Sequence, residues 1–350
     1  MIDCHVHCRD WDEDYKETIA HALAVAENSK ISGIFDMPNT NPPVISRDTV
    51  RLRLREANKL YSRVFYGLYV GLTPNLDQIK ESVECVRDYF PKKGDRAGVI
   101  GLKMFAGKSV GNLGIINEEE QRGVFDSLSD LGYNGILVVH CEKESEMHSE
   151  LWDYKNPITH SYTRPERSEI ESIRNIVDFA IDSEYLGKLH IAHVSTSESV
   201  ELVKQYKRLL NISCGATPHH LLLDNSLMQN GDGILYKVNP PLRDPETRQG
   251  LFKCFLNGDI DVLESDHAPH TLSDKTKKHM SGIPWLACWP EVFEILKQKG
   301  ADSSLIEKMS HDNINTIFGT DINKIEFKGK IIEGDYRDSY AFNPLKYLRS

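Results

Sequence analysis

Two histidines near the start of the chain stand two residues apart in an apolar segment, Ile2-Asp-Cys-His-Val-His-Cys-Arg9. If this segment is a β-strand, His5 and His7 point to the same face, about 7 Å apart along the backbone. Neutral imidazoles held together on a rigid strand are suitable ligands for a metal ion such as Zn²⁺. A single His-x-His pair often has no such role, so the prediction of a metal site depends on further ligands.

Four more residues that can bind a metal or carry a proton fall inside or at the end of apolar segments. Lys103 follows Val-Ile-Gly-Leu, His140 follows Ile-Leu-Val-Val, His193 follows Leu-His-Ile-Ala, and Asp266 follows Val-Leu-Glu-Ser. A bare ammonium is unfavourable in an apolar strand, so Lys103 needs either an acidic partner or a chemical modification. Each residue alone could be a hydrogen-bonded core residue, but their recurrence at strand ends favours one shared metal site.

Short apolar runs alternate with longer amphipathic stretches along the chain. The apolar runs predict strands at 2–6, 33–37, 64–72, 98–105, 135–140, 189–194, 212–216 and 260–264. The amphipathic stretches predict helices at 15–29, 46–61, 75–89, 118–131, 167–183, 197–209, 245–256 and 290–298. Strands this apolar on both faces, each followed by a helix, indicate an α/β fold with a closed parallel (β/α)₈ TIM-type barrel. A doubly wound open sheet is the alternative, but no Gly-x-Gly-x-x-Gly turn follows the first strand.

In a (β/α)₈ barrel the carboxyl ends of all strands meet at one rim, where active sites of this fold lie. The metal-binding residues noted above belong to the predicted strands one, four, five, six and eight. We therefore expect them to converge on one site. We assign residues 1–318 to the barrel and 319–350 to a C-terminal tail, with a short β appendage at 324–343 as the remnant of a small β portion.

The composition is that of a soluble globular protein, since 40% of the 350 residues are hydrophobic and 27% are charged. The formal net charge of −10, without a dense Lys/Arg stripe, argues against a nucleic acid or an anionic membrane as partner. No apolar run is long enough to cross a bilayer and no signal peptide is visible, so we expect a cytoplasmic protein. The seven cysteines include no Cys-x-x-Cys pair, which favours reduced thiols. Cys4 and Cys8 are either additional ligands or small core residues.

The combination of these residues resembles the amidohydrolase superfamily and, within it, the dihydroorotases. The matching segments are Asp3-Cys-His-Val-His-Cys-Arg-Asp10, Asp36-Met-Pro-Asn-Thr-Asn-Pro-Pro43, Gly101-Leu-Lys-Met-Phe105, Val139-His-Cys-Glu142, Ala192-His-Val-Ser195, Val238-Asn-Pro-Pro-Leu-Arg243 and Ser265-Asp-His-Ala-Pro-His-Thr271. The sequence departs from the family in two respects. The chain begins directly at the first strand, so most of the N-terminal β-sandwich portion of many relatives is absent. Trp285 and Ala287 also replace the glycine and glutamate that are usual there.

The resemblance implies two zinc ions. His5 and His7 would hold the first ion, His140 and His193 the second, and Lys103 would bridge them. A lysine amine only donates hydrogen bonds and cannot join two cations, but in this family the lysine is carbamylated by CO₂ and becomes an anionic group. Asp266 would contact the first zinc and act as the catalytic proton carrier.

The resemblance also implies a reaction, the reversible hydrolysis of the cyclic amide of L-dihydroorotate to N-carbamoyl-L-aspartate in pyrimidine (UMP) biosynthesis. The substrate-binding positions of the family correspond here to His7, Arg9, Asn39, Asn239 and His270. Ser109, in the glycine-containing loop 106–117, and Gly282 are further candidates for a substrate contact. An arginine can bind a carboxylate through two parallel hydrogen bonds, which suits Arg9 to the ring carboxylate.

Three readings remain open on the sequence. The first is dihydroorotase, and the second is a hydantoinase/dihydropyrimidinase or an allantoinase, which share the metal ligands but do not generally carry Arg9 together with His270. The third is a non-catalytic scaffold, although such relatives have typically lost ligands that are present here. Relatives commonly form homodimers, and some associate with aspartate transcarbamoylase, so both are partners that the resemblance implies besides the small-molecule substrate.

Overall fold

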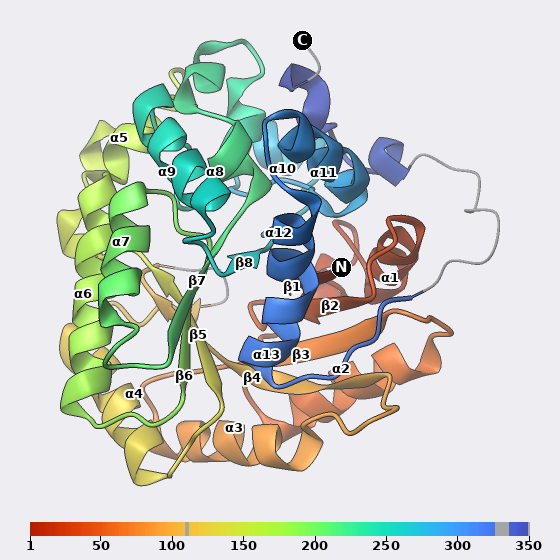
Figure 1. Cartoon of the computed structure of the whole chain (residues 1–350), viewed down its shortest axis with the longest axis vertical. Coiled ribbons are helices and arrows are strands. Elements are labelled where there is room, and N and C mark those ends of the chain that lie inside the picture. Colours follow the sequence, from red (N-terminus) through yellow and green to blue (C-terminus); the bar gives the residue numbers. More distant parts are fainter. Residues whose placement is uncertain (109–111, 326–335, 349–350) are drawn as a thin grey trace.

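The computed structural model describes residues 1–108, 112–325 and 336–348, and its centre is a barrel of parallel strands. In sequence order the strands are β1 (Ile2–Val6), β2 (Gly33–Asp36), β3 (Phe65–Gly71), β4 (Ala97–Ala106), β5 (Ile136–Cys141), β6 (Lys188–Ile191), β7 (Ile212–Ala216) and β8 (Val262–Leu263). Each strand pairs with the next one along the chain, as Figure 1 shows. A bridge between Val6 and His267 joins the two ends, so the barrel is nearly closed. The predicted (β/α)₈ architecture is confirmed.

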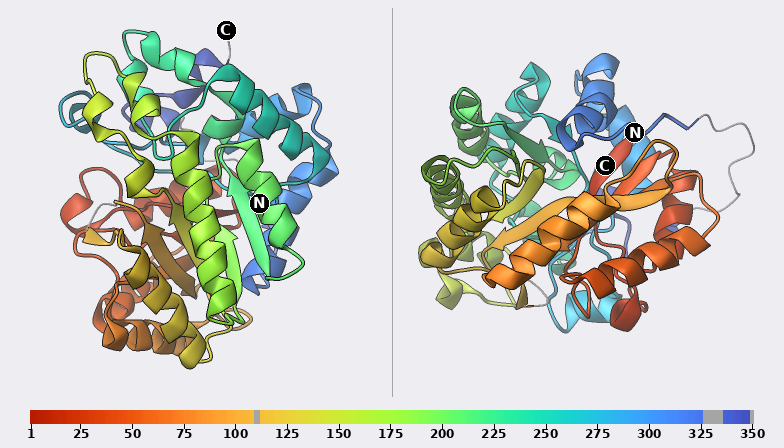
Figure 2. Two further views of the ribbon diagram at one scale, coloured as in Figure 1. Left: turned by 90° about the vertical axis from the view of Figure 1, so that its left-hand side faces the viewer. Right: turned by 90° about the horizontal axis from the view of Figure 1, so that it is seen from below.

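A helix follows each strand on the outside of the barrel, and α6 and α7 cover the strands in the left view of Figure 2. The main helices are α1 (Ile19–Asn28), α2 (Arg47–Lys59), α3 (Leu76–Tyr89), α4 (Glu118–Asp130), α6 (Glu166–Asp182), α7 (Ser197–Tyr206), α9 (Pro245–Asn257) and α11 (Trp289–Gln298). Short helices lie in the connections, namely α5 (Thr159–Thr163), α8 (Pro218–Leu222) and α10 (Leu272–Thr276). After α11 the chain forms α12 (Ser303–Glu307), a π-helical turn (Lys308–Asp312) and α13 (Asn313–Phe318).

Polar caps explain where the helices begin. Ser46 accepts a hydrogen bond from the Thr49 backbone, and the Thr49 side chain bonds back, which is a capping box at the predicted start of α2. The helix predicted at 15–29 begins later, because Thr18 caps it at Ile19. Residues Trp11–Glu13 form a separate 3₁₀ turn before it.

Two of the strands that end earlier than predicted are followed by site residues. The strand predicted at 189–194 ends at Ile191, and the one predicted at 260–264 contains only Val262 and Leu263. His193 and Asp266 have φ angles of 41° and 47°, which an extended strand cannot accommodate. These two side chains are therefore placed by the turns that leave the barrel, not by the strands.

The barrel interior is a packed apolar core and not a channel. Cys4, Phe35, Tyr69 and Val138 pack together there, and Phe318 of α13 lies 5.3 Å from Phe35 between ring centroids. The α13 end of the interior is therefore filled by side chains. The opposite rim, where the carboxyl ends of the strands lie, is the end at which active sites of this fold are found.

The described residues of the tail form no strand. Tyr336–Ser339 and Pro344–Tyr347 are 3₁₀ turns, and the rest of the predicted appendage, 326–335, lies outside the described residues. Aromatic side chains of the tail pack on the barrel instead, and the Tyr340 hydroxyl donates to Glu17 at 2.8 Å. The division of the chain at residue 318 stays a prediction. Among the residues described, no helix has both the length and the hydropathy needed to cross a bilayer.

Candidate active site

A cleft of about 440 Å³ opens at the rim formed by the carboxyl ends of the strands. Predicted site residues that line it are His5, His7, Arg9, Asn39, His140, His193, Asn239, Asp266, His270 and Gly282. Lys103 is fully buried in β4, and its charge acts on His5, His7 and His193. Ser109 lies outside the described residues. The structure thus brings together residues that are up to 277 positions apart in sequence.

His5, His7 and Asp266 form the first group of possible metal ligands. The Asp266 Oδ1 atom lies 3.0 Å from His7 Nε2 and 3.5 Å from His5 Nε2. One ligand atom from each residue lies within 4.8 Å of the other two, and all three residues are buried. Burial is the main cause that lowers the pKa of His5 to about 4 and raises the pKa of Asp266. His5 is therefore neutral at pH 7, which is the form that binds a metal.

His140 and His193 form the second group. His140 Nδ1 lies 3.2 Å from His193 Nε2, so two ring nitrogens point at the same small volume. The rings of His5 and His193 are 5.0 Å apart between centroids, which joins this group to the first. Burial holds the pKa of His193 well below its usual value, and so His193 is also neutral. Converging imidazoles beside a carboxylate fit a metal site.

Lys103 lies beside both groups without a hydrogen-bond partner for its amine in the described part of the chain. Its side chain is fully buried, and Nζ lies 4.9 Å from the centroid of the Phe105 ring. Burial lowers the pKa of Lys103 to about 8, although the carboxylates of Glu264 and Asp266 act in the opposite direction. A buried polar atom without a partner is unusual in a native structure, which makes Lys103 a candidate for a functional role.

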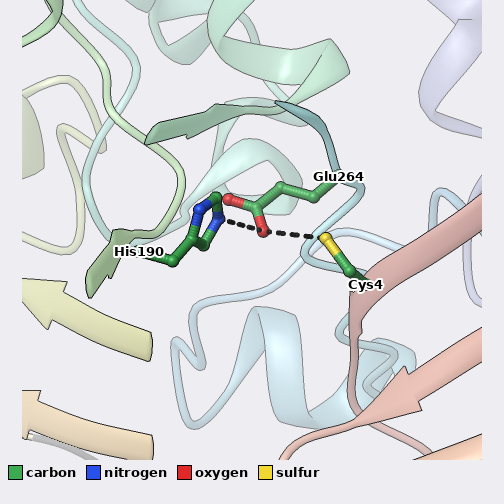
Figure 3. A group of neighbouring side chains, drawn as sticks. All are labelled: Cys4, His190 and Glu264. Atoms are coloured by element: carbon green, nitrogen blue, oxygen red, sulfur yellow. Dashed lines mark hydrogen bonds and ion pairs between the residues drawn. The ribbon is translucent and has the colours of Figure 1, made fainter. Parts of the chain in front are cut away.

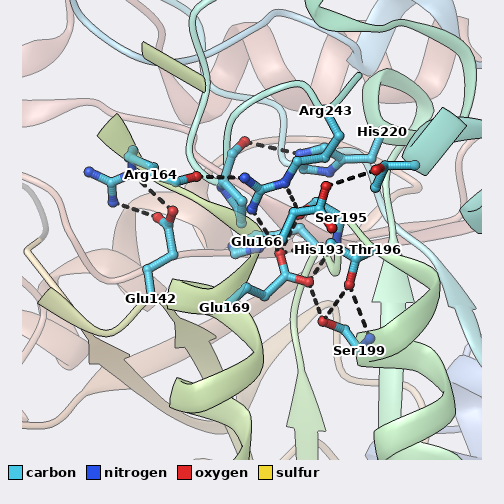
Figure 4. Close-up of polar contacts among 12 residues, drawn as sticks. Glu142, Arg164, Glu166, Glu169, His193, Ser195, Thr196, Ser199, His220 and Arg243 are labelled. Atoms are coloured by element: carbon cyan, nitrogen blue, oxygen red, sulfur yellow. Dashed lines mark hydrogen bonds and ion pairs between the residues drawn. The ribbon is translucent and has the colours of Figure 1, made fainter. Parts of the chain in front are cut away.

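A charged network lies beside His140, and Figure 4 draws its Glu142, Arg164 and Arg243 side chains. His140 Nε2 lies 3.0 Å from Glu142 Oε2, and the Arg164 guanidinium donates to both oxygens of Glu142. Burial alone would raise the pKa of Glu142, but Arg164 and His140 hold it well below its usual range. Arg243 donates to the Arg164 carbonyl at 2.6 Å. A carboxylate behind a ligating histidine fixes the ring orientation and the tautomer.

Glu264 has a similar position behind His5. Its carboxylate lies 3.4 Å from His5 Nδ1, 3.5 Å from His190 Nε2 and 3.7 Å from Cys4 Sγ, as shown in part in Figure 3. Burial and Glu264 raise the pKa of the Cys4 thiol well above its usual value. Cys4 is therefore a protonated thiol that contacts Glu264, while Cys8 belongs to the outer apolar core.

A second polar region, beside the first group of ligands, could bind a carboxylate. Arg9 Nη2 lies 3.2 Å from His270 Nε2, and His270 Nε2 also lies 3.0 Å from the Ser281 carbonyl oxygen. Within the described ranges, Arg9 Nε and Asn39 Oδ1 are buried and have no hydrogen-bond partner. Burial, assisted by the Arg9 charge, holds the pKa of His270 far below its usual value. Arg9 is therefore the cation of this region, and its donors are available to an anionic ligand.

Asn239 and Gly282 line the cleft next to His270, since Ser281 lies between them and the His270 ring. Asn239 Oδ1 accepts hydrogen bonds from the Ser281 hydroxyl, at 3.2 Å, and from His160 Nε2, at 2.9 Å. This fixes the amide and turns its NH₂ group away from these partners. Gly282 has a φ of 145°, and a Cβ there would lie 2.4 Å from the Ala268 carbonyl oxygen, so only glycine fits. Lys237 lies nearby, and its Nζ donates to Ser281 Oγ at 2.9 Å.

Sequence reasoning missed several residues of this site. Glu264 and Glu142 follow apolar runs as Asp266 and His140 do, so the same criterion could have predicted them as site residues. Arg164 lies in a long connection without any pattern, and Lys237 precedes the Asn-Pro-Pro motif without a distinctive spacing. Their roles become visible only through contacts between distant segments.

Comparisons with known proteins identify relatives across the whole barrel, although no protein-family model matches the chain. The chain is 31% identical over 341 residues to a dihydroorotase of Methanothermobacter thermautotrophicus, covering 95% of this chain and 71% of the relative. It is 34% identical over 333 residues to a dihydroorotase of Pyrococcus furiosus, covering 94% of this chain and 68% of the relative. An allantoinase of Salmonella gallinarum is 27% identical over 365 residues, covering 98% and 75%.

Solved structures show the same fold. An L-hydantoinase from Arthrobacter aurescens matches with a TM-score of 0.79 and 24% identity, covering 91% of this chain and 70% of that one. A dihydroorotase from Campylobacter jejuni matches with a TM-score of 0.67 and 18% identity, covering 94% and 84%. At these identities the structures establish the barrel and not the substrate. The similarity to curated dihydroorotases, at 31% and 34% identity over nearly the full chain, shows that the chain belongs to the dihydroorotase family.

Proposed function

We propose that this chain is a zinc-dependent dihydroorotase that interconverts L-dihydroorotate and N-carbamoyl-L-aspartate in pyrimidine biosynthesis. The observation that carries the proposal is the arrangement of the cleft. Possible metal ligands occupy one part of it, and the Arg9–His270 pair, 3.2 Å apart, lies beside them. A cyclic amide with a carboxylate on its ring would place its reacting carbonyl near the first part and its charge near the second.

Membership of the family implies a metal cofactor, and the residues fit a site for two zinc ions. His5, His7 and Asp266 would hold one ion, and His140 and His193 the other. Lys103 would bridge them as a carbamate, which forms when the neutral amine attacks the carbon of CO₂ and the nitrogen loses a proton. The pKa of about 8 keeps a useful fraction of the buried amine neutral near physiological pH, and the amine has no competing partner in the described structure.

Bound zinc lowers the pKa of water and polarises a carbonyl group. Asp266 is suited to the proton transfer of the reaction, because burial raises the pKa of its carboxyl group and its Oδ1 faces His5 and His7. It would accept the proton from the attacking water and deliver it to the ring nitrogen that leaves. In the reverse direction it would remove the proton from the carbamoyl nitrogen as the ring closes.

The remaining residues would orient the substrate. Arg9, His270 and Asn39 would bind the ring carboxylate, with the Arg9 guanidinium as the charged donor. Asn239 and the backbone at Gly282 would contact the ring, and His7 would lie next to the reacting carbonyl. A contact from Ser109 stays a prediction, as do the homodimer, the association with aspartate transcarbamoylase and the cytoplasmic location.

The test is a comparison of substrates with the enzyme supplied with zinc and bicarbonate. We expect a far higher kcat/KM for dihydroorotate than for hydantoin, dihydrouracil or allantoin, because only dihydroorotate carries a carboxylate for Arg9. A preference for an uncharged ring would favour the hydantoinase or allantoinase alternative. Absence of both turnover and bound zinc would favour the scaffold.

A further inference from the structure

The segment that carries Arg9 has an unusual backbone. Arg9, Asp10 and Trp11 have consecutive φ angles of 53°, 68° and 49°, and none of them is glycine. Non-glycine residues rarely adopt positive φ, and a run of three persists only when surrounding contacts hold it. The run begins three residues after Val6, the last residue of β1, so it sets the direction in which the Arg9 side chain leaves the backbone.

Arg53, from the middle of α2, contacts this backbone at Arg9. Its side chain is fully buried, and Nη2 donates to the Arg9 carbonyl oxygen at 2.9 Å and to Asp36 Oδ2 at 2.7 Å. Asp36, the last residue of β2, accepts the Cys8 backbone N–H through Oδ1 at 2.8 Å. The Arg53–Asp36 pair therefore binds the backbone on both sides of the Cys8–Arg9 peptide bond, at the Cys8 N–H and at the Arg9 carbonyl oxygen.

Neighbouring groups fix Arg53 itself. The Tyr66 hydroxyl donates to Asp36 Oδ2 at 2.6 Å and accepts from Arg53 Nε at 3.1 Å. The Trp11 ring lies 5.0 Å from the Arg53 guanidinium carbon, so the third residue of the run covers the cation. Well-packed apolar residues often stabilise a protein as much as a buried ion pair does. The contribution of the Arg53–Asp36 ion pair is therefore the backbone geometry that it imposes on residues 8–11, and not added stability.

We propose that Arg53 is a positioning residue that aims the Arg9 guanidinium at the substrate carboxylate. It does so by holding the Arg9 carbonyl and, through Asp36, the Cys8 amide. The inference rests on the proposed function, in which Arg9 binds that carboxylate. With this backbone course Arg9 Nη2 lies 3.2 Å from His270 Nε2. A displacement of about 1 Å in a binding group can reduce activity about a hundredfold.

The test uses Arg53→Lys, which keeps a cation beside Asp36 but lacks the planar fork needed to reach Asp36 and the Arg9 carbonyl together. We expect KM for dihydroorotate and the inhibition constant of orotate, which shares the carboxylate, to rise about tenfold. We expect kcat to change less than about twofold, because Arg53 contacts none of the proposed metal ligands. Arg51→Lys, at an exposed position of the same helix, is the matched control and should leave both constants unchanged.

A merely structural role would give a different pattern. If Arg53 acts through Arg9, adding Arg53→Lys to Arg9→Met should have no further effect on KM. The inference would be overturned if KM of the double variant were a further tenfold higher than that of Arg9→Met. It would also be overturned if Arg53→Lys alone lowered kcat and left KM unchanged. If Arg53→Lys does not fold, Tyr66→Phe removes one hydrogen bond to Asp36 without leaving a charge unpaired and should raise KM in the same direction. An unchanged KM in that variant would also overturn it.

Wild-type turnover of dihydroorotate separates this inference from the proposed function. Without wild-type turnover both are refuted, because Arg9 then has no substrate carboxylate to bind. With wild-type turnover and an unaffected KM in the Arg53 variant, only the positioning role is refuted.

Discussion

Lys103 should destabilise the enzyme when neither metal nor CO₂ is present. Its amine is fully buried and has no hydrogen-bond partner in the described structure, and its pKa falls from 10.5 to about 8. At about 1.4 kcal/mol per pKa unit, this change corresponds to about 3 kcal/mol of stability. Replacing Lys103 with Met, which has a similar shape and no charge, should therefore stabilise the metal-free protein at pH 7.

The sign of the pH dependence follows from proton binding. Between pH 8 and 10.5 the unfolded chain holds a proton on Lys103 that the folded protein has lost, so the free energy of unfolding rises with pH. The destabilisation is complete below about pH 8 and disappears above about 10.5. The Lys103→Met variant should lack this rise, and its advantage should shrink from about 3 kcal/mol at pH 7 to about zero at high pH.

The assay is urea denaturation of chelator-treated protein in CO₂-free buffer, followed by tryptophan fluorescence at several pH values. Lys80→Met, at an exposed position of α3, is the control and should show little change at any pH. Equal unfolding free energies for the wild type and Lys103→Met at pH 7 would refute the view that an unpaired ammonium is forced into this site.

Three further variants test the proposed roles of individual side chains. Lys103→Ala should abolish turnover and regain part of it with a short carboxylic acid such as propionate, and full activity without the acid would contradict the bridge. Arg9→Met should raise KM for dihydroorotate about tenfold to a hundredfold, since it removes a charge-assisted pair of hydrogen bonds, whereas an equal rise for dihydrouracil would exclude the carboxylate contact. Glu142→Gln should weaken zinc binding at least about tenfold in chelator competition, because Glu142 orients His140, and an unchanged affinity would show that it does not.

Local sequence determined the elements of this fold. Short continuous apolar runs and period-3.6 amphipathic runs depend only on neighbouring residues, so the strand and helix order followed from them. Caps such as Ser46 with Thr49 act within one turn and are visible in the sequence. Because parallel strands in a barrel all end at one rim, the positions of His5, Lys103, His140 and His193 relative to the strands were enough to predict a common site.

Tertiary structure alone decided how that site is held. The backbone at His193 and Asp266 turns with positive φ, a conformation set by the surrounding contacts and not by these residue types. The support for the ligands comes from pairs such as Glu264 with the His193 amide, 71 residues apart. Arg53 is 44 residues from Arg9, and in the sequence nothing distinguishes it from the other arginines of its helix. No periodicity or motif links residues at such separations, and their partners are defined only when the chain closes into the barrel.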